Sequence, residues 1–135
     1  MSNALYDSGR QKFLEGSIAI LTDDIKLCFV DSADYTPNLT TDDFLNDIAG
    51  AGIVATSGNF ANKTSAAGVF DADDVVVSSV SGDIFEYVVI YKDSGVAGTS
   101  PLIALIDTAT GLPFTPTGNN ITVAWDNGSN KILKL

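Results

Sequence analysis

The feature that most constrains the fold is a series of short apolar, β-branched runs separated by polar turns. The longest, Ile84–Tyr91, is apolar at both alternating sets of positions, which predicts a strand in the interior of a sheet. Ile25–Val30 and Leu102–Ile106 have the same character. Turn signals recur about every 8–12 residues, a spacing typical of antiparallel β proteins.

The acidic residues favour the same fold class. All but two of the 17 acidic side chains are aspartates, and Asp favours turns and caps over helix interiors. The length of 135 residues fits one domain with a substantial core. We therefore predict a mainly β, single-domain antiparallel sandwich or barrel of about eight or nine strands, with a short N-terminal helix and one further short helix.

The helices are expected at two places. Residues 3–15 read as an amphipathic helix that ends at Gly16, and residues 1–16 are treated as an N-terminal helix or arm on an antiparallel β domain of residues 17–135. Thr40 and Asp43 predict the start of the second helix, which Gly50 would end.

The C-terminal segment predicts one more pair of strands. Residues 121–125 alternate, with Ile121, Val123 and Trp125 on one face, which favours a place in the core or an interface. The turn-forming residues 126–130 then predict a final hairpin that leads into residues 132–135.

Composition excludes several kinds of chemistry. The formal net charge of −10 opposes binding to nucleic-acid phosphates, and the absence of His excludes Ser-His-Asp and Cys-His catalysis. The Asp71–Asp74 cluster fails the EF-hand pattern, because Val75 and Val76 occupy its fifth and sixth positions. Cys28, in an apolar run, is interpreted as a buried hydrophobe. We expect no enzymatic activity, no catalytic residues, no cofactor and no metal.

The sequence also gives an expectation about location. The first 15 residues carry charges and have no apolar core of a signal peptide. No apolar run approaches the length of about 20 residues that spans a bilayer. We therefore expect synthesis in a cytoplasm and no contact with a membrane.

Segments along nearly the whole chain carry a resemblance to one family. They are Asn3–Leu14, Leu21–Lys26, Asp31–Thr36, Asp42–Leu45, Val54–Ser57, Asp71–Val75, Val89–Asp93, Ile106–Pro113 and Trp125–Gly128. Together they resemble a family of small acidic structural proteins encoded by tailed bacteriophages. The family has no catalytic motif to carry over.

The resemblance implies a virion component made in the host bacterial cytoplasm. The size, acidity and β content suit a capsid cement or decoration protein on the capsid exterior. Such a protein binds the major capsid protein and stabilises the shell, as a homo-oligomer for which a trimer is favoured. Apolar and aromatic side chains that would serve as protein–protein contacts are Leu5, Tyr6, Phe13, Leu14, Val96 and Trp125.

Three alternatives stay open at this point. A phage tail or neck component has similar small β domains. A carbohydrate-binding module for host attachment would show an exposed aromatic platform, for which Trp125 is the candidate. A metal-dependent hydrolase would bring acids such as Asp73 together in a cleft.

Overall fold

The computed structural model describes residues 3–135 and confirms the mainly β, antiparallel prediction. Within these residues the chain forms ten strands, one α-helix (α1, Asp7–Leu14) and three short 3-10 helices: η1 (Leu45–Asp47), η2 (Gly50–Gly52) and η3 (Ala97–Thr99). The strands are β1 (Ala4–Leu5), β2 (Ile25–Val30), β3 (Ile53–Thr56), β4 (Thr64–Ala66), β5 (Val69–Asp71), β6 (Val75–Val77), β7 (Tyr87–Lys92), β8 (Leu102–Ile106), β9 (Ile121–Val123) and β10 (Leu133–Lys134).

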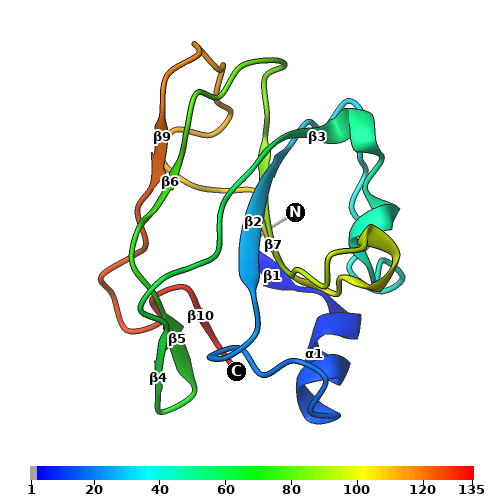
Figure 1. The fold of residues 1–135 in the computed structure, drawn as a ribbon, viewed down its shortest axis with the longest axis vertical. Coiled ribbons are helices and arrows are strands. Elements are labelled where there is room, and N and C mark those ends of the chain that lie inside the picture. The colour runs from blue at the N-terminus through cyan, green and yellow to red at the C-terminus, as the bar shows by residue number, and fades with distance from the viewer. Residues whose placement is uncertain (1–2) are drawn as a thin grey trace.

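The strands form three sheets, and none of them closes into a barrel. The largest has five strands in the order β1-β8-β7-β2-β3, a second has the order β10-β5-β4, and the third pairs β6 with β9. All of the strand pairs are antiparallel. Figure 1 shows β2 and β7 in the middle, with the two smaller sheets on one side and α1 and the 3-10 helices on the other.

The five-stranded sheet is buried on both faces. Leu27, Phe29 and Ile90 face the smaller sheets, where the rings of Phe29 and Phe85 stack with centroids 4.2 Å apart. Cys28 belongs to the cluster on the opposite face. Because water reaches neither face of the sheet, β2, β7 and β8 are apolar at nearly every position, and this makes them recognisable in the sequence.

Residues 31–52 cover this opposite face with irregular backbone. Tyr35 and Ile48 from this segment pack with Val30, Val89 and other buried side chains of the sheet. The prediction of buried Cys28 is confirmed, and burial raises the pKa of its thiol to about 12.

The N-terminal segment closes one edge of the five-stranded sheet. β1 pairs with β8, and the Tyr6 backbone N–H donates to the Ile103 carbonyl (3.0 Å). The Asn3 side chain accepts bonds from the backbone N–H groups of Asp107 (2.8 Å) and Thr108 (3.0 Å) and donates to the Thr108 carbonyl (3.0 Å). Residues 3–6 are therefore fastened to a part of the chain about a hundred positions away.

Helix α1 then lies directly against β8. Gly9 is its buried residue, and a Cβ added there would stand 2.6 Å from the Leu102 carbonyl oxygen and 3.2 Å from the Ile103 Cα. The absence of a side chain therefore allows the helix backbone to touch the strand backbone.

The predicted boundaries of the first helix were partly wrong. Instead of a helix over residues 3–15, residues 4–5 are a strand and the helix begins at Asp7. The backbone donors and acceptors of residues 4–5 pair with β8, and this long-range partner outweighs the local helical pattern.

The predicted second helix was also wrong. Residues 40–50 contain no α-helix, and only η1 and the start of η2 lie there. The Asp47 carboxylate accepts bonds from the backbone N–H groups of Asp43 (2.7 Å) and Phe44 (3.2 Å). Asp47 thus satisfies these two backbone donors within a tight turn. Such side-chain bonds compete with the backbone hydrogen bonds of a regular helix.

The predicted final hairpin was wrong as well. β9 pairs with β6, and β10 pairs with β5 at Leu133 opposite Phe70. The segment between β9 and β10 therefore crosses from one small sheet to the other. Pairing with β5 buries Leu133 against the main core. The turn-forming residues 126–130 indicate a local hairpin and do not reveal this distant partner.

Candidate functional site

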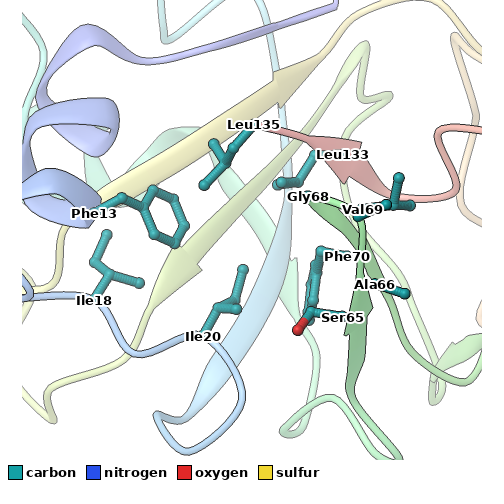
Figure 2. A pocket seen from close by; sticks show the side chains of 11 residues that line it. Phe13, Ile18, Ile20, Ser65, Ala66, Gly68, Val69, Phe70, Leu133 and Leu135 are labelled. Carbon is teal, nitrogen blue, oxygen red and sulfur yellow. The ribbon is translucent and has the colours of Figure 1, made fainter.

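An apolar groove opens between the layers at the end of the molecule where α1 and β10 terminate (Figure 2). Its volume is about 340 Å³. Phe13, Ile18 and Ile20 form one wall, and Phe70, Leu133 and Leu135 lie across from them. These six side chains are apolar and Ser65 also lines the groove, so most of its wall offers apolar contact area.

The segment after α1 is held in place by three hydrogen bonds and one ion pair. Lys92 Nζ reaches back from β7 to donate to the Ser17 carbonyl (2.8 Å) and to pair with Asp23 Oδ2 (3.1 Å). The same carboxylate accepts the Ala19 N–H (2.8 Å), and Lys63 donates to the Asp23 carbonyl. Partial burial opposes ionisation of Asp23, but these donors lower its pKa below the usual value.

The other wall is the β4–β5 hairpin with β10. Ser65 lies opposite Phe70, and Phe70 lies opposite Leu133, so the three share one face of their sheet. Figure 2 shows Ser65 and Phe70 on the groove side. Thr64, the neighbour of Ser65 on an exposed strand, lies on the opposite face by strand alternation.

One exposed leucine lines the groove, and two more follow lining residues in the sequence. Leu14 is 90% exposed, Leu135 62% and Leu21 45%, and each is part of the groove wall or next to a wall residue in sequence. We call the groove together with these leucines the mouth patch. Exposed apolar side chains gathered near an apolar groove are typical of contact sites for other proteins.

Two lysines neighbour groove residues in sequence, but Lys12 Nζ lies 5.6 Å from the Phe44 ring centroid and Lys134 lies on the face of β10 opposite to Leu133. Lys12 precedes Phe13, and Lys134 lies between Leu133 and Leu135. Lys134 is exposed and has no ion-pair partner among residues 3–135. Lys12 lies 3.9 Å from the Glu15 carboxylate, a separation at which an exposed pair contributes little.

The structure separates the six contact residues predicted from the sequence. Phe13 and Leu14 lie at the mouth patch, whereas Leu5 is half-buried and Tyr6 is completely buried. Val96 is exposed on the loop between β7 and β8. The sequence pattern missed Ile18, Ile20 and the other groove residues. The signal available for them was the apolar character of residues 18–21 outside any predicted strand.

Tyr6 has a structural role inside the protein. Its hydroxyl is 2.9 Å from that of Tyr35, which donates to Asp42 Oδ2 (2.7 Å). The same carboxylate oxygen accepts the Asn38 N–H (2.8 Å). Burial raises the pKa of both tyrosines well above the ordinary value. The network fastens residues 35–42 to the N-terminal segment.

Trp125 lines a second, larger pocket of about 680 Å³ between the five-stranded sheet and the segment that includes β9. The prediction that Trp125 shares a face with Ile121 and Val123 is confirmed, since all three pack against the main core. The indole Nε1–H donates to the Asp73 carbonyl (3.0 Å), and its ring lies 5.5 Å from that of Phe60. Trp125 is thus a wall residue and not an exposed platform.

The acidic cluster noticed in the sequence supports this wall. Asp74 Oδ1 accepts the Trp125 backbone N–H (3.1 Å), and Asp73 Oδ2 accepts the Asn62 side-chain amide (2.6 Å). Both carboxylates therefore bind parts of the fold and do not converge in a cleft.

A different set of acids comes together from distant parts of the chain. Carboxylate oxygens of Asp31, Asp34 and Asp83 lie within 4.8 Å of one another, and Asp31 is buried. Asp31 Oδ1 already accepts the Ala33 N–H (2.9 Å). Nothing further at this cluster points to a bound ion, and we assign none.

Comparisons with known proteins add no relative. No family model matches the chain, and no curated protein matches it. No helix within residues 3–135 is long and apolar enough to cross a membrane.

Proposed function

We propose that the protein is a structural component of a tailed-bacteriophage virion, a decoration protein that binds the major capsid protein on the outside of the capsid. The resemblance of the sequence to small acidic phage structural proteins supports the virion. The observation that carries a binding role is the mouth patch, in which exposed Leu135 lines an apolar groove and exposed Leu14 and Leu21 follow lining residues in the sequence.

The physical reason is the cost of leaving this surface in water. Burial of apolar area contributes about 25 cal/mol per Å², and large exposed apolar side chains gathered around a groove gain this free energy when a partner covers them. The groove is lined mainly by apolar side chains, with Ser65 as a polar one. The surface is therefore suited to holding another protein.

Binding of this kind stabilises a shell by mass action. A module that binds the assembled lattice and not its dissociated subunits lowers the free energy of the lattice. The formal net charge of −10 keeps the rest of the surface from associating with packaged nucleic acid. A trimeric arrangement would place one copy at each of three neighbouring shell subunits.

Cryo-electron microscopy of the virion tests the proposal. We expect density for the protein at many equivalent positions on the capsid exterior, and earlier thermal disruption of particles that lack it. A few copies at the tail or neck would overturn the capsid assignment in favour of a tail component. Absence of the protein from purified particles would overturn the virion role altogether.

A further inference from the structure

We propose that Asn127 is a self-modifying site, at which the backbone nitrogen of Gly128 attacks the Asn127 side-chain amide while Asp126 takes the proton from that nitrogen. The product is a cyclic imide, which water opens to an aspartyl or an isoaspartyl residue. The site lies in the exposed segment between β9 and β10, and its chemistry is independent of the proposed function.

The residue that follows an asparagine governs this reaction. The chain has nine asparagines, and Asn127 is the only one that precedes a glycine. A side chain on the following residue obstructs closure of the imide ring, and glycine has none. The ring therefore closes with the least obstruction at Asn127.

Hydrogen bonding separates Asn127 from most of the other asparagines. Six of the nine hold their side chains in hydrogen bonds to other residues: Asn3, Asn38, Asn59, Asn62, Asn119 and Asn120. The side chains of Asn46, Asn127 and Asn130 form none within residues 3–135. Asn46 and Asn130 are each followed by a charged residue. Only Asn127 therefore combines an unbonded side-chain amide with a following glycine.

The backbone around the site has the freedom that the attack requires. The Gly128 nitrogen reaches the side-chain carbon of Asn127 only after rotations of the backbone and side chain of Asn127. Residues 126–130 are exposed and lie outside any helix or strand. Within residues 3–135 the Asn127 carbonyl accepts one long hydrogen bond, from Lys131 Nζ (3.4 Å). An exposed segment with so few backbone bonds permits these rotations.

A base lies next to the attacking nitrogen. Asp126 Oδ1 accepts the Gly128 N–H at 3.0 Å, within the reach of about 2.6–3.2 Å that a general base needs. A Cβ on residue 128 would lie 2.8 Å from Asp126 Oδ2, so a glycine here also allows the carboxylate to approach this closely. No ion pair within residues 3–135 engages the Asp126 carboxylate. The carboxylate is therefore placed to accept the proton.

The reaction needs no co-reactant besides water. As the Gly128 nitrogen bonds to Asn127 Cγ, its proton passes to the Asp126 carboxylate. The bond from Cγ to the side-chain nitrogen then breaks, and this nitrogen takes the proton from Asp126 and leaves as ammonia. Water adds to one of the two imide carbonyl carbons, and the C–N bond at that carbon breaks. No atom is oxidised or reduced.

The product differs from the original chain in charge and in backbone length. Each event replaces a neutral amide with a carboxylate, on a chain whose formal net charge is already −10. An isoaspartyl linkage also adds one carbon to the main chain between β9 and β10. This segment connects two small sheets, since β9 pairs with β6 and β10 with β5.

Incubation of the purified protein in mildly alkaline buffer, followed by peptide mass spectrometry, tests the site. We expect the peptide that contains residue 127 to gain the mass difference between OH and NH2, with an isoaspartyl form among the products. Asn127→Gln should remove this gain, because the longer side chain closes a larger ring much more slowly. Asn130→Gln is the matched control in the same exposed turn and should retain it. No mass gain at residue 127, or a faster gain at another asparagine, overturns the site.

Asp126→Asn tests the base. The new side chain keeps an oxygen that can accept the Gly128 N–H, but an amide does not take up the proton. We expect the reaction at Asn127 to slow by about tenfold or more. Near neutral pH the wild-type rate should change little, because a base that belongs to the chain has a fixed concentration, whereas the rate of the variant should follow the concentration of hydroxide. An equal or faster reaction in Asp126→Asn overturns the role of Asp126.

Discussion

The contact between α1 and β8 leads to a prediction that runs against the usual behaviour of helices. Gly→Ala in a helix interior normally stabilises by about 0.5–1 kcal/mol, because Ala has the higher helix propensity. Gly9→Ala should instead destabilise the protein. The new Cβ would lie 2.6 Å from the Leu102 carbonyl oxygen, and this neighbour is backbone that a rotamer change cannot move away.

The magnitude follows from the contacts that must shift. Overpacking of a close contact costs about 1–3 kcal/mol, and displacement of the helix weakens the Tyr6 N–H bond to the Ile103 carbonyl, worth about 1 kcal/mol. Subtraction of the gain in helix propensity leaves a net loss of about 2 kcal/mol. For a chain of this length, that loss corresponds to a Tm lower by about 6–10 °C.

Urea unfolding followed by far-ultraviolet circular dichroism measures the difference in free energy of unfolding between variants. Gly50→Ala is the matched control, because Gly50 is exposed in η2 and an added Cβ there meets no atom within 4 Å. We expect the control to change stability by less than about 0.5 kcal/mol. If Gly9→Ala is as stable as wild type, the close approach of α1 to β8 is refuted.

Three further predictions concern groups whose protonation or bonding the fold controls. Tyr35→Phe removes the partner of the buried Tyr6 hydroxyl and should cost about 1–3 kcal/mol in urea unfolding. Because the folded-state pKa of both tyrosines is raised, the free energy of unfolding of the wild type should be highest below about pH 10 and fall above it. Tyr35→Phe should make this fall at alkaline pH less steep. An equally steep fall in the variant would contradict the burial of the Tyr35 hydroxyl. The pKa of Asp23 is lowered in the folded state, so its contribution to the free energy of unfolding is present above about pH 4 and lost as the pH falls through the folded-state pKa. Asp23→Asn should therefore reduce the dependence of the Tm on acidic pH. Lys92→Met, which removes the ion-pair partner, should reduce it in part. Cys28 should not react with a thiol reagent at pH 8 in the native state and should react at once in denaturant. Fast labelling of the native protein would show that the apolar cluster around Cys28, between the five-stranded sheet and residues 31–52, is open to solvent.

The sequence predicts the interior strands well and the partners of the outer strands poorly. β2, β7 and β8 are apolar on both faces because the five-stranded sheet is covered on both sides, and this leaves an unmistakable pattern. β5 and β10 have only three and two residues, so no periodicity indicates which strands they join. Their pairing is decided by the burial of Phe70 and Leu133 in a core assembled from the whole chain.

The mouth patch was only half predictable for a related reason. Phe13 and Leu14 stand out as apolar positions near the end of a helix. Ile18 and Ile20 lie in an irregular segment, and their place in the groove depends on Lys92, which binds that segment from β7. A contact between residues more than seventy positions apart leaves no local trace in a single sequence.

The hydrogen bonds between the Asn3 side chain and the backbone of residues 107 and 108 have a consequence for how the chain is made. β8 and its following turn are synthesised about a hundred residues after β1 and Asn3. At typical rates of about 5–20 residues per second, the N-terminal strand waits for several seconds before its partner exists. The five-stranded sheet therefore completes this edge late, and until then β1 of a nascent chain has no partner strand of its own and is open to the strands of its neighbours.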